Sequence, residues 1–390
     1  MTIEGGVQDL AVAWHDDCLR HEPAGEVWLG LRETGTEVPD RARVILAALT
    51  AAGARVTPAG PHDPAALLAV HDRELIEHLA TIWADWERGG YLADYGRDRV
   101  VPYVFPTQAM LGGLPARTPA ATHGQVGKFC YDTMTLIGPG SWEAIRAAAD
   151  CAATAAGLLA AGAQAAYALS RPPGHHATAA GYGGSCYLNN AAVAAQSLVQ
   201  SGLNRVAVLD IDAHHGNGTQ SIFYHRADVF YGSVHVDPGA GWFPHYLGFA
   251  DERGAGPGTG ANRNIPLAPG SGDQAWLDAV GQLCDDAREH GAQAIVLSLG
   301  VDAAAADPES PLQVTADGYR QAGQLIGQLG PVAAIQEGGY DLESLAEYVL
   351  AALTGVLAGR AAGSQVAGSQ VAGSQVAGAR AADGQEPAGS

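Results

Sequence analysis

Positive charge is scarce in this sequence. Aspartate and glutamate number 41 against 21 lysine and arginine residues, which gives a formal net charge of −20, and Lys128 is the only lysine. A protein that binds nucleic acid must neutralise phosphates, so this deficit argues against DNA or RNA as a partner. The negative field favours the approach of cationic small molecules instead, mainly by raising the rate of encounter.

Cysteine patterns and long apolar runs are also lacking. The chain has an odd number of cysteines, scattered without pairing: Cys18, Cys130, Cys151, Cys186 and Cys284. We therefore expect no disulfide framework and a cytoplasmic protein. No apolar run looks long and uncharged enough to span a bilayer, and the N-terminus lacks the basic and apolar regions of a signal peptide, so we expect neither membrane insertion nor export.

Strand-like and helix-like segments alternate along most of the chain. This order predicts an α/β fold with a single mostly parallel β-sheet and helices on both faces, whose ligands bind beyond the carboxyl ends of the strands. The expected strands are 10–14, 165–170, 206–212, 229–236, 294–301 and 332–336. The expected helices are 41–52, 62–90, 141–162, 190–199, 276–289 and 319–329.

Two segments depart from this alternation within what we expect to be one catalytic domain, residues 1–360. Residues 91–140 are rich in proline and glycine, and a long irregular insertion of this kind is usually functional or part of an interface. Residues 361–390 repeat Ala-Gly-Ser-Gln-Val and are too polar to build a core, so we expect a low-complexity, disordered tail.

The segment VAVLDIDAHHGNGTQ, residues 206–220, carries the strongest chemical signal. Side chains alternate along a strand, so Asp210, Asp212 and His214 point to one side of it. Carboxylates and an imidazole at the end of a buried strand suit a divalent metal, whereas the plainer alternative is an aspartate pair that caps the next helix. Asp302 ends another apolar strand and is the best candidate for a third ligand.

Two further loops offer catalytic side chains. His175 and His176 follow Gly174 in a tight turn, and next to a metal they become candidates for general acid–base catalysis. Tyr340 follows two glycines and could donate to a carbonyl or an oxyanion. Alone, these residues are weak signals, since adjacent histidines and turn tyrosines are common.

Taken in order, the motifs RPPGHHA, CYLNNAAVAA, LDIDAHHGNGTQ, SLGVDAAAADP and QEGGYD resemble the histone deacetylase superfamily, and most closely its acetylpolyamine amidohydrolase and class II branches. The resemblance covers roughly residues 10–355. It implies the arginase/deacetylase-like fold and a zinc-dependent amidohydrolase that removes an acyl group from an N-acylated amine.

The resemblance also implies a role for individual residues. Zinc, for which Fe²⁺ or Co²⁺ could substitute, would be bound by Asp212, His214 and Asp302. A structural K⁺ would be bound by Asp210, Asp212, His214, Ser233 and Val234. The catalytic residues would be His176 as general base and acid, His175 with Asp210, Asn217 as partner of His176, and Tyr340. The substrate would contact the Gly184 carbonyl and the tunnel residues Ser185 and Phe243.

Three positions differ from the pattern of the family and bear on the substrate. Ser185 stands where an aromatic residue usually forms one wall of the tunnel. His123 and Lys128 lie in a segment that resembles a rim loop, at places where we expect an acidic and an aromatic residue. These changes predict a small-molecule N-acyl amine as substrate, with acetylpolyamines not preferred over less cationic amines.

Other functions remain open at this point. A protein acetyl-lysine deacetylase and a non-catalytic acyl-amine binding protein would share most of these motifs. A ureohydrolase would need a second metal-binding aspartate, but the sequence has Gly216 there and Ala303-Ala304 after Asp302. From the insertion 91–140 we expect a homodimer.

Overall fold

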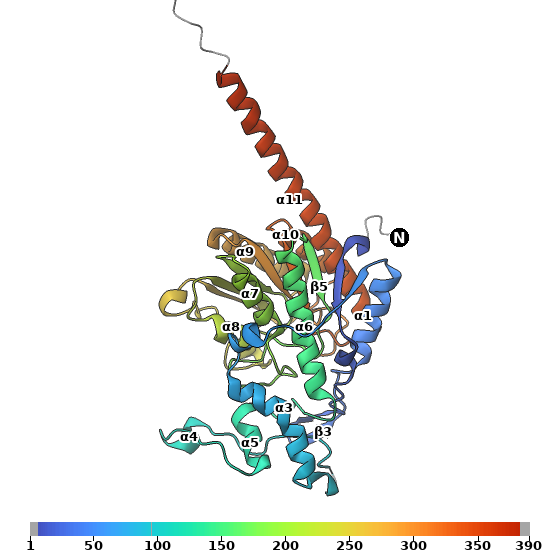
Figure 1. The fold of residues 1–390 in the computed structure, drawn as a ribbon, viewed down its shortest axis with the longest axis vertical. Coiled ribbons are helices and arrows are strands. Elements are labelled where there is room, and N and C mark those ends of the chain that lie inside the picture. The colour runs from blue at the N-terminus through green and yellow to red at the C-terminus, as the bar shows by residue number, and fades with distance from the viewer. Residues whose placement is uncertain (1–6, 95, 383–390) are drawn as a thin grey trace, which may run out of the picture.

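One parallel sheet organises the molecule (Figure 1). The computed structural model describes residues 7–94 and 96–382. Within them, the strands of the main sheet lie in the order β4 (Arg55–Pro58), β1 (Ala11–Trp14), β5 (Ala165–Ala168), β10 (Val332–Gln336), β9 (Ala294–Leu299), β6 (Val206–Asp210), β7 (Val229–Val236) and β8 (Asn262–Leu267). Every pairing in this sheet is parallel, as the alternation of elements predicts.

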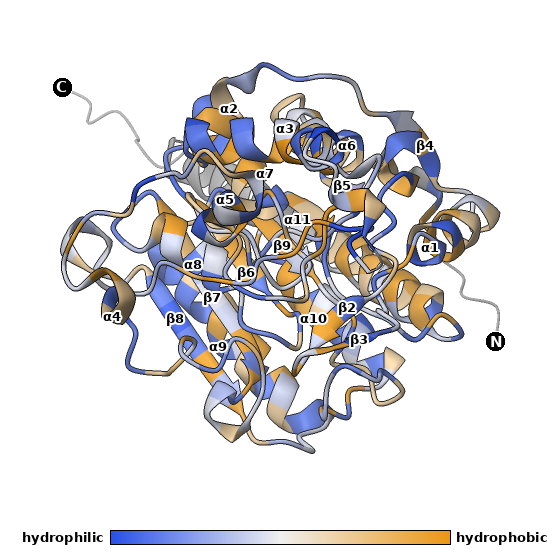
Figure 2. Cartoon of the chain, turned by 90° about the horizontal axis from the view of Figure 1, so that it is seen from below, coloured by the Kyte–Doolittle hydropathy of each residue, from blue (hydrophilic) through white to orange (hydrophobic). Residues whose placement is uncertain are grey.

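Helices cover both faces of the sheet, as expected. In Figure 2, α6 (Ser141–Ala160) and α7 (Asn190–Gln200) lie on one side of the strands, and α9 (Asp273–His290) and α10 (Ala316–Gly327) on the other. The remaining helices are α1 (Asp40–Ala51), α2 (Pro64–Leu68), α3 (Arg73–Arg88), α4 (Gln108–Leu111), α5 (Thr122–Phe129), α8 (Asn217–Phe223) and α11 (Leu345–Ala382). Short 3₁₀ turns occur at Val7–Asp9, Asp16–Leu19, Tyr91–Ala93, Pro238–Ala240 and Gly256–Gly258.

Several peripheral strands were not predicted from the sequence. The polar strand β8 contains Pro266 and borders the sheet, where a proline needs no strand partner on its nitrogen side. A small separate hairpin, β2 (Glu26–Trp28) and β3 (Leu31–Glu33), turns through Leu29 and Gly30, both with positive φ. Leucine is an unusual residue for that conformation, so the sequence carries no hairpin signal. Residues 91–140 include α4 and α5 and are less irregular than expected.

The C-terminal segment differs from the expectation of a disordered tail. Helix α11 continues through the repeats to Ala382, and residues 383–390 lie outside the described part of the chain. The physical reason is that the repeats follow directly on a packed helix, and extending an existing helix avoids the cost of nucleation. In Figure 1 this helix projects away from the body of the domain.

One part of α11 also contradicts the expectation that no segment could span a bilayer. Among the described residues, Leu345–Gly363 is long and apolar enough to do so by length and composition. However, 44% of that window is buried inside the protein, and it packs on α10 and α1. Burial of this kind is typical of a core helix in a globular domain.

Glycines allow α10 and α11 to approach backbone to backbone. A Cβ added at Gly355 would lie 2.0 Å from the carbonyl oxygen of Arg320, and one at Gly323 would lie 2.2 Å from that of Ala352. In contrast, Gly157 in α6 has nothing within 4 Å of the added atom. The two helices therefore depend on glycine at their contact, whereas the glycine in α6 is conformationally unnecessary.

We predict opposite effects of the same substitution at these sites. Gly355→Ala should lower the free energy of unfolding by about 1–3 kcal/mol, because the extra methyl forces the helices apart. Gly157→Ala should raise it by about 0.4–1 kcal/mol, because alanine restricts the unfolded chain and favours the helix. Urea unfolding followed by circular dichroism measures both, and equal effects at the two sites would contradict this account.

Candidate active site

The loops that follow four neighbouring strands meet at one edge of the sheet. They are 171–177 after β5, 211–216 after β6, 300–307 after β9 and 337–341 after β10. These are the loops that carry RPPGHHA, DAHHGN, the Asp302 segment and EGGY. Because all carboxyl ends of a parallel sheet lie at the same edge, motifs far apart in the sequence converge there.

The three residues predicted as metal ligands lie together. Asp212, His214 and Asp302 each offer one ligand atom, and these atoms lie within 4.8 Å of one another. The Nδ1 atom of His214 is 3.0 Å from Oδ2 of Asp302 and 3.4 Å from Oδ1 of Asp212. Backbone groups orient the carboxylates, since Gly338 N–H donates to Asp212 at 2.8 Å and Ala213 N–H to Asp302 at 2.7 Å.

Burial makes this carboxylate pair costly. Asp212 and Asp302 are 1% and 0% exposed. Burial and the neighbouring Asp212 carboxylate raise the pKa of Asp302 to about 7. Burial lowers the pKa of His214, but hydrogen bonds to Asp212 and Asp302 outweigh it and raise that pKa well above its usual range. Two carboxylates and an imidazole held in this way fit a divalent cation, which would neutralise both acids.

His175 is surrounded by carboxylates. Its Nδ1 atom is 3.1 Å from Oδ2 of Asp210, and Nε2 is 3.8 Å from Asp212. Burial lowers the pKa of His175, but Asp212 and Asp210 together raise it to about 10. The imidazole is therefore positively charged near neutral pH.

His176 has the opposite environment. Burial, and then the neighbouring His175 and His214, lower its pKa well below the usual value. Its Nδ1 atom lies 2.8 Å from Oδ1 of Asn217. An amide oxygen only accepts, so Nδ1 carries the proton and Nε2 keeps a lone pair. The predicted general base is therefore the histidine that stays neutral.

Tyr340 is held in place by contacts to its ring and to the backbone of its turn. The Arg41 guanidinium lies 4.6 Å from the centroid of the Tyr340 ring and donates to the carbonyls of Gly339 at 2.5 Å and Glu337 at 2.6 Å. Asp307 accepts the backbone N–H of Tyr340 at 2.6 Å. Burial raises the pKa of the Tyr340 hydroxyl well above its usual range, so it remains a donor.

Gly184 sits where a side chain cannot fit. Its φ is +57°, and a Cβ there would lie 2.5 Å from the His176 ring and 2.9 Å from Phe243. Its N–H donates to the half-buried Asp132 at 2.6 Å, and the N–H of Ser185, which also has a positive φ, donates to Thr135 at 2.9 Å. The Gly184–Ser185 turn is thus clamped from the insertion 91–140.

A cavity of about 500 Å³ opens onto these groups. It reaches His176, His214 and Tyr340, and Phe243 forms one wall with its ring centroid 4.7 Å from that of His176. Gly184 and Ser185 also line it, as predicted, together with residues that the sequence analysis missed: Glu26, Trp28, Glu33, Thr34, Thr36, Met134, Gly241, Trp242, His245 and Glu309. Three of these are carboxylates.

The predicted rim residues His123 and Lys128 have hydrogen-bond partners outside this cavity, and their role at the rim stays a prediction. Neither His123 nor Lys128 is among the residues that line this cavity. Lys128 donates to Glu74 at 2.6 Å and to Thr118 at 2.5 Å, so its charge is neutralised locally. Nδ1 of His123 and the Tyr91 hydroxyl share a hydrogen bond of 2.6 Å. Both residues belong to α5, and their partners Glu74 and Tyr91 lie in α3 and in the 3₁₀ turn that follows it.

Two residues of the predicted monovalent-cation site lie on the strand next to the metal strand. Ser233 pairs in register with Asp210 across β6 and β7, and Val234 follows it. Both are fully buried. The proximity fits the expected site, and binding of an ion there stays a prediction.

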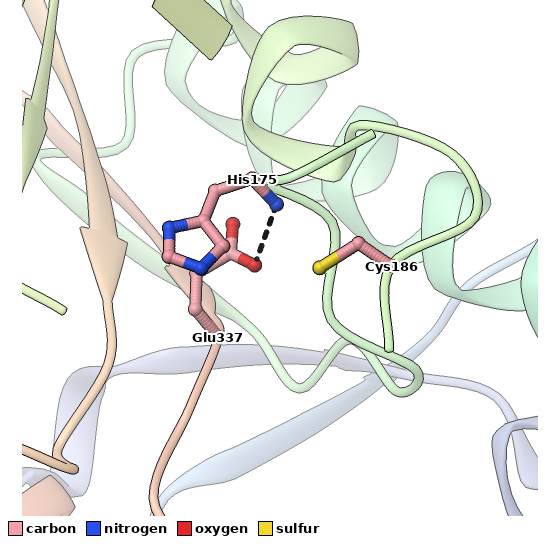
Figure 3. Close-up of side chains that lie close together, drawn as sticks. All are labelled: His175, Cys186 and Glu337. Atoms are coloured by element: carbon pink, nitrogen blue, oxygen red, sulfur yellow. Dashed lines mark hydrogen bonds between the residues drawn. The ribbon is translucent and has the colours of Figure 1, made fainter. Parts of the chain in front are cut away.

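Glu337 has a role at the site that was not predicted from the sequence. This fully buried carboxylate accepts the N–H of Gly174 at 2.6 Å. It also accepts the N–H of His175 at 3.1 Å (Figure 3). Cys186 lies beside it, and burial keeps the pKa of that thiol well above its usual value. The motif EGGY was a signal for the loop, but nothing in the sequence indicates that its glutamate orients the histidine loop.

Comparison with known proteins agrees with this geometry. Residues 35–356 match the histone deacetylase domain family. The chain is 41% identical over 350 residues to the acetylpolyamine amidohydrolase of Mycoplana ramosa, covering 89% of this chain and 99% of that protein. It is 40% identical to acetylpolyamine amidohydrolase 1 of Pseudomonas aeruginosa, covering 85% of this chain and 94% of that protein.

A solved structure gives the same result at the level of the fold. The crystal structure of acetylpolyamine aminohydrolase from Burkholderia pseudomallei superposes with a TM-score of 0.83 at 38% identity, covering 90% of this chain and 99% of that chain. With its converging motifs, its parallel sheet and this match over most of its length, the chain belongs to the histone deacetylase family, as its motifs predict.

Proposed function

We propose that this protein is a zinc-dependent amidohydrolase that removes the acetyl group from N-acetylated polyamines or related small diamines. The carrying observation is a single cavity that joins His176, His214 and Tyr340 to the carboxylates Glu26, Glu33 and Glu309. Its deep part suits amide hydrolysis, and its exposed part suits an ammonium group. The relatives named as acetylpolyamine amidohydrolases support the same substrate class.

Asp212, His214 and Asp302 would hold the metal. The observation that supports a divalent cation there is the buried carboxylate pair, whose ligand atoms gather with that of His214 and would gain further compensating charge from the ion. When bound, such an ion supplies Lewis acidity toward the acyl carbonyl and lowers the pKa of a water molecule. Zinc is the proposed metal, and this ligand set would also accept Fe²⁺ or Co²⁺. We further propose K⁺ beside Asp210, Ser233 and Val234.

The chain's own groups then account for the proton transfers. Nε2 of neutral His176 accepts a proton from the attacking water, helped by Asn217 at its other nitrogen. The charged His175 favours negative charge developing at the reaction centre. The Tyr340 hydroxyl donates to the acyl oxygen, and the Gly184 carbonyl accepts the substrate amide N–H. His176 finally returns the proton to the leaving amine.

The acidic part of the cavity changes the expected substrate preference. The prediction of a less cationic amine rested on Ser185, His123 and Lys128. Of these, Ser185 lines the cavity, whereas Lys128 is paired with Glu74 and is not among the lining residues. Instead, the Thr36 hydroxyl donates to Glu309 at 2.8 Å, and Glu26 faces Glu309 closely enough to be affected by its charge. Carboxylates so placed attract a distal ammonium at short range.

We also propose a cytoplasmic homodimer. All five cysteines are free and buried, which fits a reducing compartment. The insertion 91–140 exposes a set of large apolar side chains, Leu92, Tyr103, Met110 and Leu114. Helix α4, which carries Met110, stands out from the body in both views of the fold. Exposed apolar groups on one segment favour an interface between copies.

The metal site gives the first prediction of function. Asp302→Ala should lower the metal content from about one ion per chain to near zero, because a two-ligand site binds weakly, and should reduce turnover by at least about 10²-fold. Elemental analysis and acetate release measure the two effects. Asp278→Ala, at an exposed carboxylate of α9, is the matched control. Full activity after exhaustive chelation would contradict the proposal.

The acidic cavity gives a pH prediction. Burial and then Glu309 raise the pKa of Glu26 to about 7, so Glu26 is largely neutral at pH 6 and ionised at pH 8. The KM for N-acetylputrescine should therefore fall by about three- to tenfold as pH rises from 6 to 8. The KM for the neutral N-acetylbutylamine, measured in parallel, should not show this fall.

Glu26→Gln should abolish this pH dependence of the KM ratio, because the amide cannot ionise. Glu22→Gln, a matched change at an exposed glutamate that does not line the cavity, should keep it. A ratio that is independent of pH in the wild type would show that Glu26 does not face the bound ammonium.

The interface prediction uses charge as the probe. Light scattering should give a dimer for the wild type at micromolar concentration. The double variant Tyr103→Glu/Met110→Glu should be monomeric, because it places charge in the apolar contact. Leu68→Glu, at an exposed apolar residue of α2, should remain dimeric. A wild-type monomer, or equal dissociation of all variants, would rule out this interface.

A further inference from the structure

One buried carboxylate connects the two ends of the proposed substrate site. Oδ2 of Asp307 accepts the backbone N–H of Tyr340 at 2.6 Å and that of Asp341 at 3.3 Å. Its other oxygen, Oδ1, accepts the backbone N–H of Glu309 at 3.0 Å. Asp307 is only 7% exposed and does not line the cavity, whereas Glu309 and Tyr340 do.

Each end of this connection is also fixed from its far side. Arg41 donates to the carbonyls of Gly339 and Glu337 and packs over the Tyr340 ring. The Thr36 hydroxyl holds the side-chain carboxylate of Glu309. The hydroxyl that would receive the acyl oxygen and the carboxylate that would receive the ammonium are thus both anchored, and Asp307 is the link between them.

A side chain at position 307 can make this link only if both of its terminal atoms accept hydrogen bonds. Three N–H groups point at the Asp307 carboxylate, and an ionised carboxylate offers acceptor sites on both oxygens. An asparagine has one oxygen and one NH₂ group, so at least one of the two loops would face a donor and lose its anchor. The separation between Glu309 and Tyr340 would then be less tightly fixed, because only the contacts of Thr36 and Arg41 would remain.

We propose that Asp307 is a positioning residue that sets the length of diamine the enzyme prefers, by fixing the separation between Tyr340 and Glu309. This inference rests on the proposed function. A diamine one methylene too short or too long would reach only one of the two groups, and selectivity of this kind can exceed tenfold per methylene. The selectivity belongs to the link and not to either end alone.

The experiment compares three acetylated diamines that differ only in length: N-acetyl-1,3-diaminopropane, N-acetylputrescine and N-acetylcadaverine. For the wild-type holoenzyme, kcat/KM should favour one length by about tenfold or more. In Asp307→Asn this preference should flatten to within about threefold, with the KM of the preferred diamine rising and the values for neutral N-acetylbutylamine changing less. Metal content and thermal midpoint are measured on the same samples.

Two further variants separate positioning from general damage. Asp341→Asn changes a neighbouring carboxylate that caps α11 through Ser344 and does not join the two loops, so it should keep the wild-type length preference. Thr36→Val removes only the hydroxyl bond to Glu309, so it should flatten the preference partly. If Asp307→Asn does not fold, Asp307→Glu takes its place: the longer side chain keeps the carboxylate but moves it relative to the two loops, and it should shift or flatten the length preference, whereas an unchanged preference would overturn the inference.

The outcomes also separate this inference from the proposed function. If Asp307→Asn lowers kcat/KM equally for all three diamines and keeps the wild-type length preference, Asp307 has only a structural role. That result would overturn this inference and leave the proposed function standing. A wild type with no length preference would do the same. A wild type that hydrolyses an acetyl-lysine amide but none of the three diamines would overturn the proposed substrate class as well.

Discussion

The whole active site depends on keeping two buried carboxylates, Asp212 and Asp302, side by side. Such a pair is stable only with compensating charge, and the protein supplies part of it through His214 and through the N–H groups of Gly338 and Ala213. The parallel sheet makes this possible, because β6 and β9 are neighbours and end at the same edge. A fold with these strands apart could not bring the two acids into one site.

The same constraint explains why adjacent histidines behave differently. His175 lies against Asp210 and near Asp212, whereas His176 faces an amide and two imidazoles. Their pKa values therefore move in opposite directions, although the two residues share one turn and nearly the same burial. Pairs whose environments separate their pKa values identify the acid and base roles. Here the charge on His175 helps to keep His176 neutral.

The sequence predicts the parts of the structure that repeat a simple pattern. Strands β7 and β10 begin and end at the predicted residues, and the motifs lie at the strand ends because a parallel sheet puts them there. The hairpin that carries Glu26, and the anchors Asp307 and Glu337, could not be predicted, since their role comes only from contacts with distant segments. Composition indicates that the repeats after residue 360 cannot form a core, but not whether they extend an existing helix, and α11 runs through them to Ala382.

The substrate rim shows why charge has to be read locally. Lys128 is the only lysine in the sequence, and its predicted place at the rim would oppose a cationic substrate. In the fold, Glu74 neutralises it, and the charges that line the cavity are those of Glu26, Glu33 and Glu309. Screening limits any charge to roughly 10 Å around it, so the groups that line the cavity decide recognition. The net charge of −20 acts earlier, on the rate of encounter, and it favours a cationic substrate, as the carboxylates of the cavity do.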